Sequence, residues 1–240
     1  MHGPHSFFVT GTDTGVGKTV VAAALLALLR RDGVDAVPMK PVQTGCRRRR
    51  AGLDAPDLEF CLAAARVKAS DAERALMCPY RFAPACSPHL AARLAKASIS
   101  IPRIVTCLRR LRERHDAVVV EGAGGILVPL NARLTMLDLM RRLGLPIALV
   151  ARPGLGTLNH TLLSLGAIRE AGLQVAGVVI CRTTRGRPGA IERDNIRTLR
   201  RLARAPIWGV LPFHPTLAAG RPPRNLAAWA GRHLDPGMQE

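Results

Sequence analysis

The sequence is poor in several residue types and patterns that mark common classes of protein. Its six cysteines include no Cys-x-x-Cys pair, which argues against a zinc site and against a disulfide framework. Aromatic residues make up only 3% of the chain, so few side chains can stack on nucleic-acid bases. No apolar run approaches the ~18–20 residues that span a bilayer, and the first residues lack the features of a signal peptide. These absences predict a cytoplasmic protein without a membrane partner.

Lysine is also scarce, so the formal net charge of +18 comes almost entirely from arginine. The arginines are spread along helical segments, and we interpret them as a solvated surface rather than a specific nucleic-acid site, because high net charge alone speaks only to non-specific attraction. The one dense cluster is Arg47–Arg50. It is interpreted as a mobile, solvated loop, with attraction of anionic substrates as the alternative.

Short apolar segments alternate with helical periodicity along the chain, which predicts a doubly wound α/β fold with a mostly parallel sheet and helices on both faces. At 240 residues, we expect a single domain with an uncertain, possibly flexible tail from 221 to 240. The predicted strands are Phe7–Thr10, Ala36–Met39, Ala117–Val120, Ile147–Val150, Val175–Ile180 and Ile207–Val210. The predicted helices are Lys18–Arg31, Asp57–Arg66, Pro88–Lys96, Pro102–His115, Asn159–Ala171 and Ala190–Ala203.

The segment from Thr10 to Thr19 is the strongest functional motif. It reads Thr-Gly-Thr-Asp-Thr-Gly-Val-Gly-Lys-Thr, between a predicted strand and a predicted helix. Backbone N–H groups in such a loop, the lysine ammonium and the helix N-terminus all attract one anion, so the motif predicts a nucleotide phosphate site. The spacing departs from the common phosphate loop, because the first glycine is Gly11 where the usual position would be residue 12.

Two further motifs follow predicted strands and therefore meet the phosphate loop at the carboxyl edge of the sheet. The first is Lys40-Pro-Val-Gln-Thr-Gly, which places a second cation beside a transferring phosphate, although alone it could be a surface lysine. The second is Glu121-Gly-Ala-Gly-Gly, where a carboxylate closes an apolar strand. Such a carboxylate suits Mg²⁺ binding beside a phosphate loop, and the structural alternative is a glycine turn with a capping glutamate.

Two further segments belong with these motifs, Ser87-Pro88-His89 and the stretch from Gly154 to His160. Taken in order, all of them resemble dethiobiotin synthetase, the ATP-dependent carboxylase family of biotin biosynthesis. The resemblance covers residues 6 to about 212. It implies ATP as co-substrate and Mg²⁺ as cofactor, with Thr19, Asp57 and Glu121 as metal ligands and with Lys40 and Lys18 as catalytic residues. The implied ATP contacts are Gly15, Val16, Gly17, Lys18, Thr19, Val20, Asp57, Glu121, Gly122, Ala123, Gly124, Cys181, Arg182 and Pro212.

The resemblance also implies a reaction in which CO₂ (from bicarbonate) is joined to 7,8-diaminopelargonate to form dethiobiotin through a carbamate and a carbamic–phosphoric anhydride. It implies a homodimer whose substrate site lies at the interface. The implied substrate contacts are Thr44, Ser87, Pro88, Gly154, Leu155 and Asn159.

One departure from the family pattern concerns the nucleotide base. Many members have an asparagine that recognises adenine at the end of the strand Val175–Ile180, and Cys181 stands there in this chain. A thiol is a poor hydrogen-bonding partner, so relaxed nucleotide selectivity is expected. The alternative functions are a partition-type P-loop ATPase that binds DNA or another partner and, from a different class, a non-enzymatic nucleic-acid-binding protein.

Overall fold

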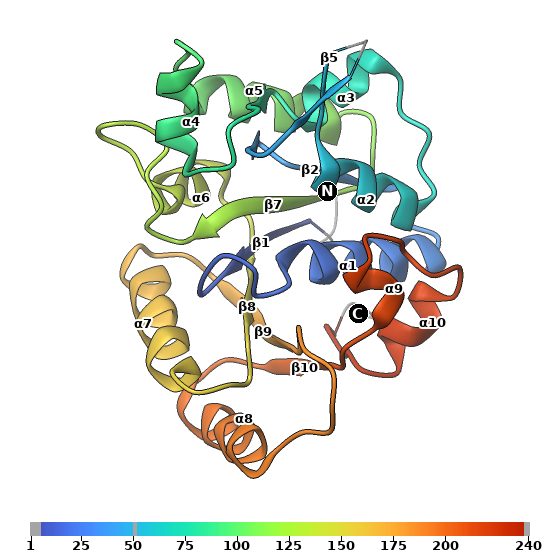
Figure 1. The fold of residues 1–240 in the computed structure, drawn as a ribbon, viewed down its shortest axis with the longest axis vertical. Coiled ribbons are helices and arrows are strands. Elements are labelled where there is room, and N and C mark those ends of the chain that lie inside the picture. The colour runs from blue at the N-terminus through green and yellow to red at the C-terminus, as the bar shows by residue number, and fades with distance from the viewer. Residues whose placement is uncertain (1–5, 50–51, 238–240) are drawn as a thin grey trace.

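A computed structural model describes residues 6–49 and 52–237, so Arg50 of the arginine cluster and residues 238–240 of the tail lie outside the described residues. The chain forms a six-stranded parallel sheet in the order β10-β9-β8-β1-β7-β2 (Figure 1). Its strands are β1 (Phe7–Gly11), β2 (Ala36–Met39), β7 (Ala117–Gly125), β8 (Ile147–Ala151), β9 (Val175–Cys181) and β10 (Ile207–Leu211). All six predicted strands are present.

The helices cover both faces of this sheet, as the alternation of apolar segments predicts (Figure 1). The longer helices are α1 (Lys18–Arg31), α2 (Pro56–Ala65), α5 (Ile101–Arg112), α6 (Met136–Leu143), α7 (Thr157–Glu170) and α8 (Ala190–Leu202). The shorter ones are α3 (Asp71–Met77), α4 (Pro88–Leu94), α9 (Pro215–Ala218) and α10 (Leu226–Gly231). The doubly wound fold class is therefore confirmed.

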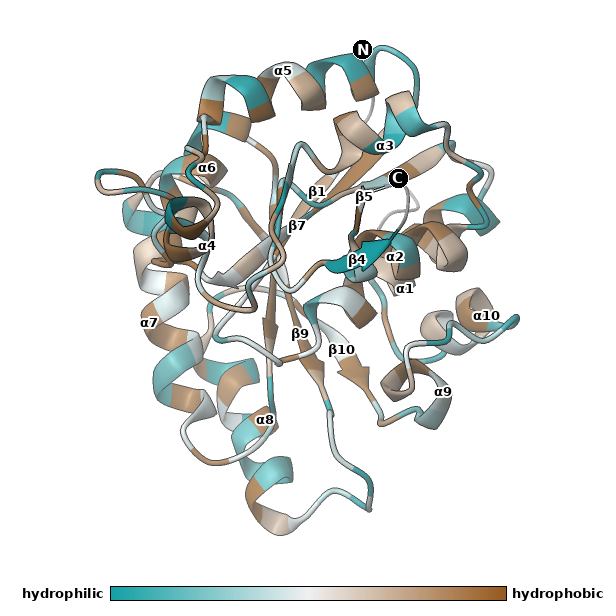
Figure 2. Ribbon diagram, turned by 45° about the horizontal axis from the view of Figure 1, so that its top comes forward, coloured by the Kyte–Doolittle hydropathy of each residue, from teal (hydrophilic) through white to brown (hydrophobic). Residues whose placement is uncertain are grey.

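Successive residues of each strand face opposite cores, because strand side chains alternate between the two faces of a sheet. Phe7 belongs to the core beneath α1, whereas Phe8 belongs to the core beneath α5 and α6. Both faces are apolar, so the central strands are brown in Figure 2, while the outer sides of the helices carry the polar residues. This double burial explains why the strands read as continuous apolar runs in the sequence.

Two small sheets lie outside the main one. β3 (Val42–Gln43) pairs in parallel with β6 (Tyr80–Arg81), and β4 (Arg47–Arg49) pairs antiparallel with β5 (Gly52–Asp54). The β4 arginines are exposed, as expected, and form the teal strand in Figure 2. The expectation of a loop at these three residues is wrong, because they pair with β5 instead.

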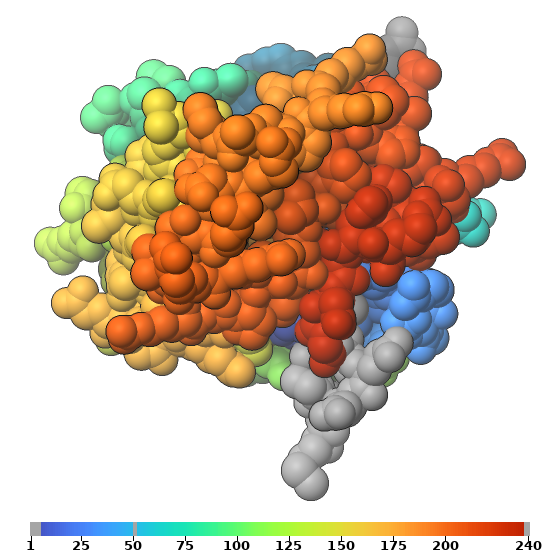
Figure 3. All heavy atoms as spheres, turned by 90° about the horizontal axis from the view of Figure 1, so that it is seen from below, coloured from blue at the N-terminus to red at the C-terminus, as the bar shows by residue number. Residues whose placement is uncertain are grey.

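The segment predicted as an uncertain tail contains helix α10, which packs against α1. Leu226, Trp229 and Ala230 of α10 are buried in the same core as the apolar side of α1. In Figure 3 the orange-to-red residues from α8 to α10 spread over one side of the molecule. None of the described helices is both long enough and apolar enough to cross a membrane.

Candidate functional site

The phosphate loop connects the end of β1 to the start of α1 at the carboxyl edge of the sheet. Gly15 and Gly17 have φ values of 72° and 100°, in the left-handed region that favours glycine. Gly17 is the N-cap residue of α1, so Lys18 and Thr19 are the first residues of the helix. The orphan N–H groups of this helix start and its positive dipole end fit the anion site that the sequence predicts.

Lys18 is held back onto its own loop. Its Nζ donates a hydrogen bond to the carbonyl oxygen of Asp13 at 2.7 Å. Burial, followed by the nearby positive charge of Lys40, lowers the pKa of Lys18 to about 8. Phosphate oxygens near this loop would compete with the Asp13 carbonyl for the Lys18 ammonium, and their charge would favour its protonated form.

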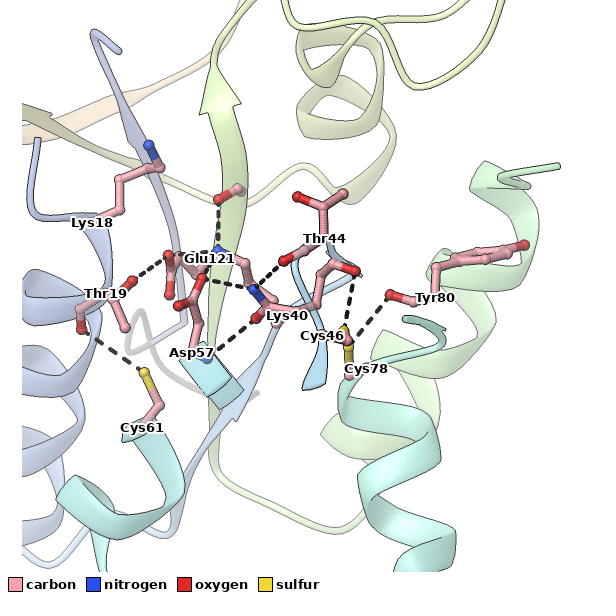
Figure 4. A network of polar contacts seen from close by, with 12 residues as sticks. Lys18, Thr19, Lys40, Thr44, Cys46, Asp57, Cys61, Cys78, Tyr80 and Glu121 are labelled. Carbon is pink, nitrogen blue, oxygen red and sulfur yellow. Dashed lines mark hydrogen bonds and ion pairs between the residues drawn. The ribbon is translucent and has the colours of Figure 1, made fainter. Parts of the chain in front are cut away.

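Lys40 lies at the centre of a buried polar cluster (Figure 4). Its Nζ donates to Glu121 Oε1 at 2.6 Å and to the Gly122 carbonyl oxygen at 3.2 Å, and it lies 2.9 Å from Asp57 Oδ2. Thr19 Oγ1 donates to the same Glu121 Oε1 at 2.9 Å. Residues from α1, the end of β2, the start of α2 and β7 thus converge on one point.

The charges of this cluster shift the pKa values of its members. Burial works against the Lys40 ammonium, but the carboxylates of Glu121 and Asp57 outweigh it and raise the pKa of Lys40. Burial also disfavours the Asp57 carboxylate, but Lys40 and a hydrogen bond from Gln43 hold its pKa below the usual value. Burial raises the pKa of Glu121, because Lys40 and Thr19 offset only part of its desolvation. The pair of Lys40 and Asp57 is therefore charged at neutral pH.

The three predicted metal ligands, Thr19, Asp57 and Glu121, all belong to this cluster. Among the described residues, no group of three or more His, Cys, Asp and Glu side chains is arranged to hold a metal ion by itself. Two carboxylates and a hydroxyl nonetheless fit Mg²⁺, which is usually held by one or two carboxylates and completes its shell with phosphate oxygens and water. The donor set therefore suits a metal that arrives with a nucleotide.

A cavity of about 490 Å³ joins the phosphate loop to the Lys40 cluster. Of the residues predicted to contact ATP or substrate, its lining includes Gly15, Gly17, Lys18, Thr19, Val20, Lys40, Thr44, Asp57, Glu121, Ala123 and Gly124. Gly122 contributes its carbonyl to Lys40, and the Val16 side chain is fully buried beneath the loop. Most of the predicted nucleotide site is thus brought together in one place.

A second hollow of about 240 Å³ lies between the loops that follow β8 and β9. Gly154, Leu155 and Arg182 line it, and the Leu155 side chain is 94% exposed. The Arg182 guanidinium is paired with Glu192 at 3.1 Å and donates to the Gly186 carbonyl oxygen. Four further predicted contacts belong to neither described lining: Asn159 on α7, Ser87 and Pro88 at the start of α4, and Pro212 after β10.

Cys181 lies at the end of β9, where the resemblance expects the base-recognising residue. Its side chain is buried beneath the phosphate loop, and burial raises the pKa of the thiol to about 12. A Cβ atom added at Gly17 would lie 2.4 Å from its Sγ. The thiol therefore lies against the predicted phosphate loop and lines neither described cavity.

Sequence reasoning assigned no role to Gln43, although it lies within the Lys40 motif. Its buried side chain forms two hydrogen bonds with Asp57, which is fourteen positions away. The only indication in the sequence is its place between Val42 and Thr44, which is a predicted substrate contact. Its partner could not be inferred, because that contact depends on how α2 lies against β3.

Comparison with known proteins places this site in a family. A family model described as an AAA domain matches residues 5–221. The ATP-dependent dethiobiotin synthetase BioD of Anaeromyxobacter sp. (strain K) is 46% identical over 229 residues, which cover 95% of this chain and 97% of that protein. The chain belongs to the dethiobiotin synthetase family. The dethiobiotin synthetase of Halalkalibacterium halodurans is 40% identical over 88% of this chain and 86% of its own length.

The fold itself is shared more widely than the family. The MinC:MinD cell division protein complex of Aquifex aeolicus contains a chain that matches with a TM-score of 0.61, covering 95% of this chain and 94% of that one. The sequence identity is only 13%. This similarity supports the P-loop fold and carries no argument for a partition-type function, because one fold serves many activities.

Proposed function

We propose that this member of the dethiobiotin synthetase family catalyses the ATP-dependent carboxylation and ring closure of 7,8-diaminopelargonate to dethiobiotin. The observation that carries the proposal is the position of Lys40, whose ammonium is buried between Asp57 and Glu121 in the cavity that begins at the phosphate loop. A phosphate loop alone would serve any nucleotide-binding protein. A second buried cation beside it suits a reaction that transfers phosphate to a second anion.

The proposed reaction has three balanced steps. One amine of the substrate attacks CO₂ and loses a proton to give a carbamate. A carbamate oxygen attacks the γ-phosphorus of ATP, and the bond from that phosphorus to the β–γ bridging oxygen breaks. ADP departs, and the product is a carbamic–phosphoric anhydride. The second amine then attacks the carbonyl carbon, phosphate departs, a proton is released and the ureido ring closes.

The residues of the site contribute mainly position and charge. Lys18 exchanges the Asp13 carbonyl for phosphate oxygens, and the N–H groups at the start of α1 hold the same phosphates. Lys40 offsets negative charge between the γ-phosphate and the carbamate, and its two carboxylate partners fix the ammonium in place. Thr44 and Ala123 line the same cavity, where Thr44 would contact the diamine and Ala123 would contact ATP.

Mg²⁺ belongs to this proposal as the partner of ATP. When bound, it would neutralise charge on the phosphate oxygens as they react. Thr19, Asp57 and Glu121 would hold it, because their three oxygen donors lie together at the start of the phosphate-binding helix. The Thr19 hydroxyl donates its proton to Glu121, so both lone pairs of its oxygen remain available to a metal ion.

A homodimer is the proposed active form. Leu155, itself a predicted substrate contact, and Leu163, on α7, are 94% and 65% exposed, so both are available to an interface. Covering them with a second copy would bring Gly154, Leu155 and Asn159 to the diamine bound by the partner. Ser87 and Pro88 would complete the pocket on the first copy.

Phosphate release is the experiment that tests the activity. Purified protein with bicarbonate, Mg²⁺ and ATP is assayed with and without 7,8-diaminopelargonate, and the series is repeated with CTP and GTP. Diamine-dependent release with formation of dethiobiotin by mass spectrometry is the expected result. Release that is indifferent to the diamine would instead favour a partition-type ATPase, and no release would direct attention to DNA binding, measured by its salt dependence.

A further inference from the structure

Gln43 is a buried polar residue that the proposed mechanism does not use. It is the second residue of β3, and its carbonyl oxygen accepts a hydrogen bond from the Phe82 N–H at 2.8 Å. The residue is only 5% exposed. Its backbone is therefore fixed by the pairing of β3 with β6, which holds the side chain at one place in the cavity wall.

The amide of Gln43 contacts Asp57 with both of its polar atoms. Nε2 donates to Asp57 Oδ2 at 3.2 Å, and Oε1 accepts from the Asp57 backbone N–H at 3.3 Å. Nε2 also donates to the Thr44 carbonyl oxygen at 3.1 Å, so both of its hydrogens are used. These contacts determine which way the amide is oriented, because exchanging its oxygen and nitrogen would break all three.

The backbone contact explains how α2 begins where it does. The N-cap residue of α2 is Ala55, whose side chain cannot accept a hydrogen bond, and Pro56 has no N–H to satisfy. The Asp57 N–H is an orphan donor of the first turn, and Gln43 Oε1 accepts it from outside the helix. A residue on β3 thus performs the function of an N-cap and places Asp57 at the edge of the site.

The side-chain contact makes the two carboxylate oxygens of Asp57 unequal in their hydrogen bonding. Lys40 Nζ and Gln43 Nε2 both contact Oδ2, and among the described residues no hydrogen bond is formed to Oδ1. The carboxylate is therefore held in one rotation about its Cβ–Cγ bond, with Oδ1 left for a further ligand. Without the Gln43 amide, this rotation is no longer fixed, and Lys40 can attract either oxygen.

We propose that Gln43 is a positioning residue that orients Asp57 for the divalent cation of the nucleotide complex. The proposal rests on the proposed function, in which Asp57 is one of the metal ligands. Residues that orient metal ligands typically affect metal affinity by about 10- to 100-fold when they are replaced. Gln43 should therefore strengthen binding of the metal–nucleotide complex and have little influence on binding of the nucleotide alone.

The test measures nucleotide affinity of the full chain by calorimetry, with ADP in Mg²⁺ and with ADP in EDTA. Gln43→Met keeps the size of the side chain and removes both contacts to Asp57. We expect it to weaken binding with Mg²⁺ about tenfold or more and to change binding in EDTA by less than about twofold, since Gln43 does not touch the phosphate loop. Competition by Mn²⁺, followed by its electron paramagnetic resonance signal, gives a direct reading of metal affinity.

Three variants separate this role from a structural one. Gln174→Met is the matched control, because Gln174 is exposed before β9 and its substitution should change neither affinity. Gln43→Glu keeps the acceptor for the Asp57 N–H and so preserves the start of α2, but its carboxylate repels Asp57. It should lose metal affinity while remaining folded. Gln43→Met on an Asp57→Asn background should have no further effect on Mg²⁺-dependent affinity, because the two residues act through one another.

The outcomes are distinct from those that test the enzymatic activity. Any of three results would overturn the positioning role. These are equal losses of ADP affinity in Mg²⁺ and in EDTA, an unchanged metal dependence of ADP affinity in both Gln43 variants, and additive effects with Asp57→Asn. If the wild-type protein binds Mg²⁺–ADP through Asp57 but releases no phosphate with the diamine, the proposed activity fails while the role of Gln43 stands. In active enzyme, Gln43→Met should raise KM for Mg²⁺–ATP about tenfold with a smaller change in kcat.

Discussion

The Cys181 sulfur lies directly beneath Gly17 of the phosphate loop, so closely that a Cβ atom at Gly17 would be 2.4 Å from Sγ. The left-handed φ of 100° at Gly17 adds backbone strain for any other residue at this position. The shape of the loop therefore requires that residue 17 has no side chain and that residue 181 is no larger than a cysteine.

Cys181→Ala should change the affinities for ATP, CTP and GTP by a similar factor, because the thiol contacts the phosphate loop, which all three nucleotides share. We expect a loss of about 1 kcal/mol in unfolding free energy from the removed packing. Calorimetric titrations with the three nucleotides check this, with Cys107→Ala on α5 as a control for loss of a buried thiol. A change confined to ATP would mean that Cys181 reads the base.

Lys40→Ala should lower kcat for diamine-dependent phosphate release roughly 100- to 1000-fold, the usual effect of removing one preorganised donor to a developing charge. It should also destabilise the protein by about 3 kcal/mol, because the Glu121 carboxylate stays buried without its cation. Single-turnover kinetics and urea unfolding measure the two effects. Lys40→Ala combined with Glu121→Gln should recover much of the stability and none of the rate, whereas a rate loss below tenfold would contradict the assigned role.

Leu155→Asp should prevent assembly of the proposed dimer, because it places a charge on a side chain that is 94% exposed in the single chain. Light scattering should give the mass of one 25.8 kDa chain for the variant and twice that for the wild type. Diamine-dependent turnover should fall at least tenfold, while the affinity of the phosphate loop for ADP should be unchanged. Leu202→Asp, at an exposed leucine on α8, is the control; a monomeric wild type would refute the interface.

Asp138→Asn should remove a pH-dependent contribution to stability. Asp138 Oδ2 accepts hydrogen bonds from the N–H and the hydroxyl of Thr135, at 2.7 and 2.8 Å, which lower the pKa of the carboxyl. A lowered folded-state pKa gives stability that is present above the ordinary value of 3.8 and is lost as the pH falls through the folded-state value.

The expected difference between wild type and Asp138→Asn is therefore about 0.5 kcal/mol at pH 7, since this capping contact is near solvent, and it should be smaller near pH 2. Urea unfolding at the two pH values measures it. Asp194→Asn, at an exposed position of α8, provides the baseline. A difference that is the same at both pH values would show that the charge of Asp138 has no part in capping α6.

The central sheet could be predicted because strands that are buried on both faces appear in the sequence as short, continuous apolar runs. Helix α1 was bounded correctly at Lys18 and Arg31 for the same reason, together with the glycines before it. Helices α3 and α6 were missed, although each begins with a capping box, at Ser70 and Thr135 respectively. Since α4 has only seven residues and was predicted, length alone does not explain these two omissions, and the capping boxes were the local signal that was overlooked.

The rest of the site depended on contacts between distant segments. Strand β3 has two residues and exists only because Tyr80 and Arg81 lie beside it, which no local pattern indicates. The motifs predicted that Lys18, Lys40 and Glu121 lie at one edge of the sheet, since each comes after a predicted parallel strand. The bond between Gln43 and Asp57, in contrast, depends on the tertiary placement of α2.

The packing of α10 against α1 has a consequence for how the protein acquires its nucleotide site. These helices lie near opposite ends of the described sequence, so the side of α1 that contacts α10 stays uncovered until most of the chain has been synthesised. Contacts of such long sequence separation form late, because the entropy of closing the intervening loop opposes them. During translation, a chain that does not yet include Trp229 would therefore leave the α10-facing side of α1 exposed, and binding to a chaperone would compete with folding at this point.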